Sequence, residues 1–367
     1  MAARRVVIKV GSSTLADPSR GVDGAFVSML AAQIERVIRD GWQVVLVSSG
    51  AIAAGVQRLG FSERPCDMPS LQAVASVGQV ALVECYAASF AEFGIPVGQV
   101  LLTRNDTGHR ESFLHARDTF ERLLQLGAVP VVNENDTVAV DEIRFGDNDT
   151  LAALVATMVN ADLVVLLSDI AGLYDTDPRL SDAATLLENV DELTDDVMAA
   201  ASGVGSSMGS GGMVTKVDAA KMLMKAGIPM VICDGRRENV IVDAVAGLPV
   251  GTMFDGGEGT IGARKLWILL GGKAVGEIVI DDGACEALRV RHTSLLPAGV
   301  VGVHGEFMEG DAVALVDGGG AIVARGLTDL SSVDLQAVMG LKSAEIVSVL
   351  PGVAGRAAVH RDRLVVL

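Results

Sequence analysis

The first two-thirds of the chain alternates short apolar runs with longer stretches in which apolar residues recur every three or four positions. The short runs are rich in Val, Ile and Leu, which is typical of strands that are buried on both faces of a parallel sheet. They are "RVVIKV", "WQVVLVS", "IPVGQVLLT", "AVPVVN", "DLVVLLS" and "PMVIC", at residues 5–10, 42–48, 95–103, 128–133, 162–168 and 229–233.

The longer stretches predict amphipathic helices at residues 25–40 and 113–127. In the first of these, Phe26, Leu30 and Ile34 fall on one helical face. Strands that alternate with helices predict an α/β fold, with a mainly parallel sheet between two layers of helices. Residues 137–147 alternate apolar and polar positions instead, and predict a small hairpin beside the sheet.

The pattern changes near residue 255, where a glycine-rich segment begins. Beyond it, short strands and turns dominate until the helical pattern "SSVDLQAVMG" at residues 331–340. We therefore predict a first domain at residues 1–258, a linker at residues 259–272 and a second, mostly-β domain at residues 273–367.

Composition and charge limit the possible partners. The chain has 367 residues and a net charge of −17, which disfavours binding to nucleic acid or to an anionic membrane. The N-terminal apolar run is too short for a signal peptide, and no run approaches the roughly 20 apolar residues of a membrane span. We expect a cytoplasmic protein, and its four widely spaced cysteines are expected to be reduced thiols.

Two predicted strands end in small-residue turns that suit an anion. "VVIKVGSSTL" brings Lys9 and Gly11 to a strand end, and "VVLVSSGAIAAG" does the same with Ser49 and Gly50 before a helix of small residues. Backbone N–H groups in such turns hold phosphate at the edge where open α/β sheets bind ligands. The alternatives are an ordinary lysine at a strand end and tight packing of a helix on the sheet.

A third loop, "GSGGMVTK" at residues 209–216, opens a helix with glycines and Lys216. A lysine in the first turn of a helix opposes the helix dipole, so this placement indicates an anionic partner. The alternative is a flexible loop with a solvated lysine. The GxxxxGK[ST] pattern does not occur in the chain, so the common NTPase loop is excluded. This loop also lacks the GxGxxG pattern, which disfavours a nicotinamide site here.

Six carboxylates gather in "VVNENDTVAVDEIRFGDND" at residues 131–149, immediately after a predicted strand. Helix capping explains at least one of Asp147, Asn148 and Asp149. It does not explain Glu134, Asp136 and the strand-end Asp169 as well. These groups suit a cation, which could be Mg²⁺ bound together with nucleotide phosphates, a lysine, or the ammonium group of an amino acid.

The motifs together resemble the amino acid kinase family, in particular its members that phosphorylate glutamate. "KVGSSTL", "SSGAIAAG", "LLTRND", "VVNENDTV", "FGDND", "LLSDIAGLYDTDPR" and "GSGGMVTK" occur in the family's order. From "GEIVIDDGA" to "IVARGL" the second domain is similar to a PUA domain. The resemblance implies a three-layer αβα sandwich on a mainly parallel sheet, followed by a small mostly-β domain.

The resemblance also implies transfer of the γ-phosphoryl group of ATP to the side-chain carboxylate of L-glutamate, which is the first step of proline biosynthesis. It implies that Lys9 and Lys216 contact the ATP phosphates and that Asp149 positions both lysines. The implied glutamate site consists of Ser49, Gly50, Asp136 and Asn148. The implied ATP site consists of Lys9, Gly11, Ser168, Asp169, Ser210, Gly211, Gly212, Met213, Val214, Thr215 and Lys216.

The resemblance further implies Mg²⁺ held mainly by nucleotide phosphates, inhibition by proline, and a homodimer or homotetramer. One rival is a sister kinase that acts on aspartate, acetylglutamate, carbamate or uridylate. Another is an RNA-binding or RNA-modifying protein, since PUA domains commonly contact RNA. The charge of the second domain disfavours RNA binding, because residues 272–367 carry eight basic and twelve acidic side chains.

Overall fold

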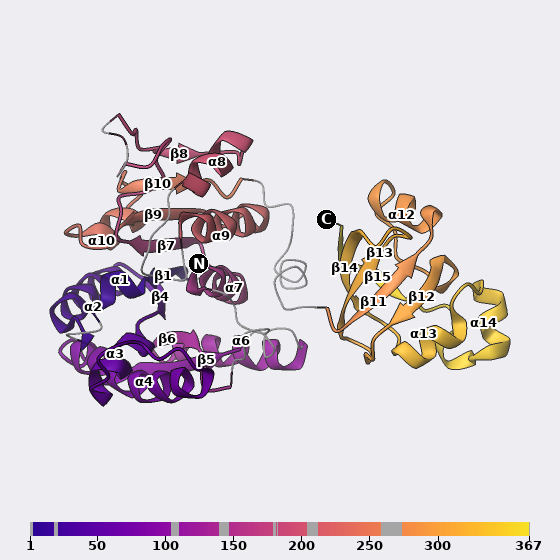
Figure 1. Cartoon of the computed structure of the whole chain (residues 1–367), viewed down its shortest axis with the longest axis horizontal. Coiled ribbons are helices and arrows are strands. Elements are labelled where there is room, and N and C mark those ends of the chain that lie inside the picture. The colour runs from indigo at the N-terminus through magenta and orange to yellow at the C-terminus, as the bar shows by residue number, and fades with distance from the viewer. Residues whose placement is uncertain are drawn as a thin grey trace. The chain divides into compact units, whose positions relative to one another are not determined.

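The computed structural model describes residues 3–17, 21–103, 110–138, 147–178, 181, 183–203, 212–257 and 274–366. They form two compact units, one around an eight-stranded sheet and one around a five-stranded sheet (Figure 1). Nearly all of the hairpin predicted at residues 137–147 lies outside the described residues, as does the linker predicted at residues 259–272.

The N-terminal sheet has the strand order β5-β6-β4-β1-β7-β9-β10-β8. Its paired strands are parallel except where β10 runs antiparallel to β9. The predicted runs correspond to β1 (Arg4–Val10), β4 (Trp42–Ser48), β5 (Val97–Leu102), β6 (Val129–Glu134), β7 (Leu163–Ser168) and β9 (Met230–Asp234). The two short strands that the sequence did not predict are β8 (Asn189–Val190) and β10 (Gly251–Phe254).

Helices cover both faces of this sheet (Figure 1). One layer holds α2 (Gly24–Arg39), α4 (Met68–Ala91) and α10 (Val240–Val245), and the other holds α7 (Asn148–Met158) and α9 (Met213–Ala226). The described part of this unit also contains α1 (Ser12–Leu15), β2 (Ala16–Asp17), β3 (Gly21–Val22), α3 (Ala51–Leu59), α6 (Arg110–Gln125) and α8 (Asp195–Gly203). The arrangement confirms the predicted three-layer αβα sandwich.

Two glycines let α3 and α4 pack in direct backbone contact. A Cβ on Gly55 would lie 1.9 Å from the carbonyl oxygen of Val74, and a Cβ on Gly78 would lie 1.7 Å from that of Ala51. The small residues of α3 therefore serve contact between helices, whereas the sequence had suggested contact between helix and sheet. The four cysteines all lie in the described residues and are free thiols, as predicted.

Helix α4 corrects the expectation that no segment is apolar enough to span a membrane. By length and composition, α4 is long and apolar enough to do so. Its Leu82, Tyr86 and Phe90 are fully buried and pack in the same core as α2 and β4. It is a core helix of the N-terminal unit, apolar nearly all round, and therefore lacks the amphipathic period that marks surface helices.

The C-terminal unit is built on a five-stranded sheet with the order β12-β11-β13-β14-β15. Neighbouring strands are antiparallel except for the parallel pair β11 and β13. Its strands are β11 (Gly276–Ile280), β12 (Val300–His304), β13 (Ala312–Val316), β14 (Ile322–Thr328) and β15 (Val359–Val366). Short helices pack against them: α12 (Asp282–Arg289), η1 (Pro297–Gly299), α13 (Ser332–Val338), α14 (Ser343–Val349) and η2 (Pro351–Val353). The second unit is mostly β, as predicted.

Candidate active site

The small-residue turns meet at the carboxyl edge of the N-terminal sheet. In the parallel pairing, Val10 at the end of β1 lies opposite Ser48 of β4 on one side and Leu167 of β7 on the other. The turns that follow these three strands are therefore neighbours, and they contain Gly11, Ser49 and Asp169. This edge is where open α/β sheets bind ligands.

Strand alternation turns Lys9 toward the layer formed by α7 and α9. Its neighbours Ile8 and Val10 belong to the core cluster that includes α2, so the side chain between them points to the opposite face. Lys9 is only 5% exposed, and its Nζ lies 2.6 Å from Oδ1 of Asp149, in the first turn of α7. A buried ammonium group requires such a partner.

The second oxygen of Asp149 binds the start of α9. Nζ of Lys216, a residue 7% exposed, lies 3.2 Å from Oδ2 of Asp149. Oγ1 of Thr215 donates to the same oxygen at 2.9 Å. The sequence indicated an anionic partner for Lys216, and Asp149 is one such partner. The fully buried carboxylate of Asp149 therefore joins two lysines that are 207 positions apart in the chain.

The electrostatics of this cluster favour the ionised carboxylate. Burial alone would raise the pKa of Asp149, but the charges of Lys9 and Lys216 and the hydrogen bonds from Lys9 and Thr215 outweigh it and lower the pKa to about 2. The one ionised carboxylate of Asp149 thus contacts two lysine side chains. Two lysines that share one carboxylate are suited to an anionic ligand at the sheet edge.

The capping prediction applies to Asp147. Its side chain accepts a hydrogen bond from the backbone N–H of Thr150 at 2.8 Å, which makes Asp147 the N-cap of α7. Burial, followed by the nearby charge of Asp149, raises the pKa of this carboxyl. Asp149, two residues further along, makes the two lysine contacts instead.

Asn148 organises the turn after β4. Its Nδ2 has two hydrogens and three acceptors within reach: Oγ of Ser49 at 2.8 Å, Oδ1 of Asn133 at 3.0 Å and the carbonyl oxygen of Ser48 at 3.2 Å, so one hydrogen is shared. Ser49 and Asn148, both predicted for the glutamate site, are therefore in direct contact. Sequence reasoning did not single out Asn133, although it stands within the quoted "VVNENDTV" motif.

Two more residues predicted for glutamate lie beside this cluster. Gly50 is the N-cap of α3 and has a φ of 99°, in the left-handed region that favours glycine. Asp136 lies half-buried in the turn directly after β6. Both follow strands that end at the same sheet edge.

The residues predicted for ATP lie partly in the described region. A Cβ on Gly11 would lie 3.8 Å from Nζ of Lys9, so this turn runs beside the lysine. Ser168 ends β7, and its Oγ donates to the exposed Asp169 at 3.2 Å. Gly212 is the N-cap of α9, whose first turn holds Met213, Val214, Thr215 and Lys216. Ser210 and Gly211 lie outside the described residues.

Among the described residues no group of three or more His, Cys, Asp or Glu side chains is placed to hold a metal ion. Asp149 itself is engaged by Lys9, Lys216 and Thr215.

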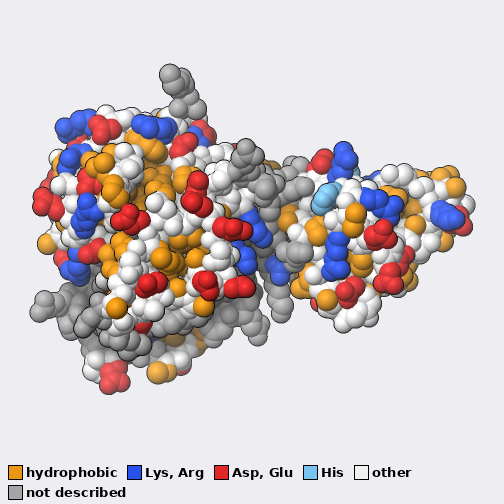
Figure 2. Space-filling view, turned by 90° about the horizontal axis from the view of Figure 1, so that it is seen from above, with side chains coloured by type: hydrophobic (Ala, Val, Ile, Leu, Met, Phe, Trp, Pro, Cys, Tyr) orange, Lys and Arg blue, Asp and Glu red, His pale blue; other side chains and the backbone are white. Residues whose placement is uncertain are grey.

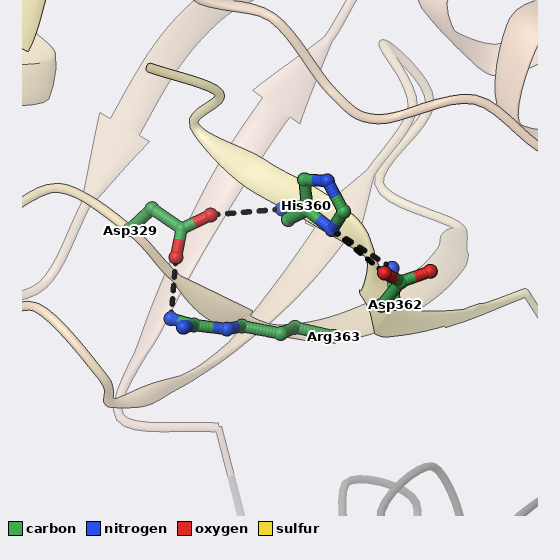
Figure 3. Close-up of a pocket in the computed structure, with 4 residues that line it drawn as sticks. All are labelled: Asp329, His360, Asp362 and Arg363. Atoms are coloured by element: carbon green, nitrogen blue, oxygen red, sulfur yellow. Dashed lines mark hydrogen bonds and ion pairs between the residues drawn. The ribbon is translucent and has the colours of Figure 1, made fainter.

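A cavity of about 330 Å³ opens in the C-terminal unit, lined by Asp329, His360, Asp362 and Arg363 (Figure 3). Its polar groups bind one another. Asp329 accepts from Nη1 of Arg363 at 2.6 Å and from the backbone N–H of His360 at 3.1 Å, while Nδ1 of His360 accepts from the backbone N–H of Asp362 at 3.2 Å. These contacts hold the end of β14 to β15.

Comparison with known proteins gives consistent matches for both units. The family model of the amino acid kinase family matches residues 4–234, and that of the PUA domain matches residues 276–350. A relative from Ralstonia pickettii, named glutamate 5-kinase, is 46% identical over 365 residues, which covers 100% of this chain and 98% of the relative. Proteins of the same name from Paraburkholderia phymatum and Caldanaerobacter subterraneus are 45% and 44% identical, and each is covered to 98%.

Proposed function

The chain belongs to the amino acid kinase family, and we infer that it transfers the γ-phosphoryl group of ATP to the side-chain carboxylate of L-glutamate. Relatives named glutamate 5-kinase align with it from end to end. The product is L-glutamyl 5-phosphate, the first intermediate of proline biosynthesis. The observation that carries the chemistry is the pair of lysines joined by the buried Asp149 at the sheet edge.

A carboxylate substrate explains which groups the site needs. The γ-carboxylate of glutamate is already ionised at neutral pH, so the reaction requires no general base. The obstacle is repulsion between an anionic nucleophile and anionic phosphate oxygens. Lys9 and Lys216 provide two ammonium groups that offset this repulsion and stabilise the charge on the transferring group.

We assign the remaining residues according to their place around this pair. Asp149 holds the two lysines in position. Gly11 lies beside Lys9, Ser168 and Asp169 stand at the end of the neighbouring strand β7, and residues 212–216 open α9. We assign these residues, together with Ser210 and Gly211 of the same glycine motif, to the nucleotide. Ser49, Gly50, Asp136 and Asn148 bind glutamate on the side of β4 and β6. Mg²⁺ would be held mainly by the ATP phosphates, where it supplies further positive charge.

The direct test of the activity is to trap the product. An acyl phosphate reacts with hydroxylamine to give a hydroxamate, which is coloured with ferric ion. The protein with MgATP, L-glutamate and hydroxylamine should form the hydroxamate, and should form far less with aspartate, acetylglutamate or carbamate. Equal or faster ATP-dependent turnover of one of those acceptors or of uridylate, followed as ADP release, would reassign the substrate.

We propose that the outer face of α4 is a contact surface between subunits of a homodimer or homotetramer. Val80 of α4 is 57% exposed, and Ala73, Ala87 and Ala91 on the same face are also exposed, with Ser76 and Glu84 as polar neighbours. Exposed apolar side chains on one helix face are stabilised when a second copy covers them. Light scattering should give a multimer for the wild type and a smaller species for Val80→Glu. An unchanged mass for this variant would place the contact elsewhere.

We expect no nucleic-acid partner, and we expect the enzyme to work in the cytoplasm, where ATP is available. On the face seen in Figure 2, basic side chains of the C-terminal unit are interspersed with acidic ones, which supports the first expectation. We assign that unit a structural or regulatory role. Proline is the expected inhibitor, and a glutamate-dependent rate unchanged by millimolar proline would contradict this.

A further inference from the structure

A chain of hydrogen bonds connects the buried side of α4 to the proposed glutamate site. The hydroxyl of Tyr86 lies 2.9 Å from Oγ of Ser48, and both residues are fully buried. Oγ of Ser48 in turn donates to the carbonyl oxygen of Ser49 at 3.1 Å. Residues 48–50, which we call the 48–50 turn, are also held by the bond from the Ser49 N–H to the Val10 carbonyl oxygen and by the Asn148 amide.

The direction of these bonds follows from the number of hydrogens available. Either hydroxyl can donate between Ser48 and Tyr86. The carbonyl oxygen of Ser49 can only accept, so when the single Ser48 hydrogen is given to it, Tyr86 is the donor to Oγ of Ser48. Burial raises the pKa of Tyr86 above its ordinary value, so the phenol keeps the proton it donates. The Tyr86 hydroxyl thus contacts the Ser48 side chain, and that side chain contacts the peptide that follows Ser49.

We propose that Tyr86 is a positioning residue for glutamate: from α4, its hydroxyl sets the 48–50 turn in the geometry in which the Ser49 hydroxyl and neighbouring backbone receive the substrate. The inference rests on the proposed function, because it takes Ser49 to be a glutamate ligand. Tyr86 would act from the core, without contact with either substrate. Changes in the packing of α4 would then change the affinity for glutamate.

A purely structural role for Tyr86 predicts a different result. Its ring fills the core and lies near Phe90, with centroids 6.5 Å apart, so loss of the ring would damage folding in any case. Tyr86→Phe keeps the ring and removes only the hydroxyl. If the hydrogen bond between Tyr86 and Ser48 only stabilised the fold, its loss would lower thermal stability and leave the affinity for each substrate unchanged.

The experiment measures KM for glutamate, KM for ATP and kcat of the full chain, with the wild type assayed first. For Tyr86→Phe we expect KM for glutamate to rise about fivefold, the effect of one net hydrogen bond, while KM for ATP stays within twofold. Ser48→Ala should raise the same KM. The double variant Tyr86→Phe/Ser48→Ala should be no worse than Ser48→Ala alone, because both changes break one chain of bonds.

Thr157→Val is the matched control. It also removes a buried hydroxyl of the N-terminal unit, but that hydroxyl donates within α7 to the carbonyl oxygen of Ala153 at 2.9 Å. It should lower the melting temperature and leave both KM values unchanged. An unchanged KM for glutamate in Tyr86→Phe, or equal rises for glutamate and ATP, would overturn the inference. Absence of glutamate phosphorylation in the wild type would instead refute the proposed function.

Discussion

Replacing Lys216 by Met removes one ammonium group from the cluster while it keeps a long, unbranched side chain. Lys216 is nearly buried, and its Nζ lies 3.2 Å from Asp149, whose other oxygen remains paired with Lys9 at 2.6 Å. Loss of one group that stabilises charge in a transition state lowers kcat by about 10²- to 10³-fold. We therefore expect kcat of Lys216→Met to fall by at least about 100-fold.

The cost of this change to folding should be smaller. Breaking a buried ion pair completely costs about 3–5 kcal/mol, but Asp149 keeps Lys9 and Thr215 as partners, so we expect a loss of about 2 kcal/mol. A domain that is stable by about 5–15 kcal/mol stays folded after such a loss. The lowered kcat therefore reports on chemistry and not on the folded fraction.

The assay combines hydroxamate formation at saturating ATP and glutamate with urea unfolding of the same preparation. Lys221→Met is the matched control, since it makes the same substitution on an exposed position of α9. It should change neither kcat nor stability appreciably. A kcat of Lys216→Met within about threefold of the wild type would refute the assignment of Lys216 to phosphoryl transfer.

Three further predictions follow from the described contacts. Asn148→Ala removes the amide that binds Ser49, so KM for glutamate should rise at least tenfold while KM for ATP stays nearly constant; equal changes in both would contradict this assignment. The folded-state pKa of Asp149 is lowered from 3.8 to about 2, so its ion pairs stabilise the fold above pH 3.8, and about 2 kcal/mol is lost as pH falls through 2. Urea unfolding between pH 5 and pH 2 should show that loss of unfolding free energy in the wild type and not in Asp149→Asn. The same dependence of unfolding free energy on pH in both proteins would refute this prediction. Gly78→Ala places a Cβ 1.7 Å from the carbonyl oxygen of Ala51 and should cost about 1–3 kcal/mol, whereas Gly24→Ala, with no atom within 4 Å, should not destabilise; equal melting temperatures would contradict the packing of α3 on α4.

The sheet was predictable because its central strands are buried on both faces and read as continuous apolar runs. The runs at 42–48 and 162–168 match or nearly match β4 and β7. Strand β10 escaped prediction because its four residues, "GTMF", give no period, and its pairing with β9 is a property of the folded sheet. Helix α4 escaped because apolar residues surround it almost evenly, so it has no amphipathic stripe.

The site was predictable in its parts but not in its contacts. Strand ends and glycine turns indicated anion binding near Lys9 and Lys216, and the acidic motif indicated a cation. Only the fold brings the two lysines to the same carboxylate, because residues so far apart in the sequence as those of β1 and α9 share no local pattern that predicts a contact. Asn133 stands in the quoted motif but was not singled out, and Tyr86 gave no sequence signal, since a tyrosine in an apolar helix is an ordinary core residue. Their roles depend on the hydrogen bonds around Asn148 and Ser48.

The central claim is that Lys9 and Lys216 converge on the phosphoryl group that moves between two anions. The most direct measurement is a crystal structure of the protein with a non-hydrolysable ATP analogue, Mg²⁺ and L-glutamate. We predict both Nζ atoms about 3 Å from phosphate oxygens, with the glutamate side-chain carboxylate facing the γ-phosphorus. A triphosphate bound away from the two lysines, or one that contacts neither, would contradict the account.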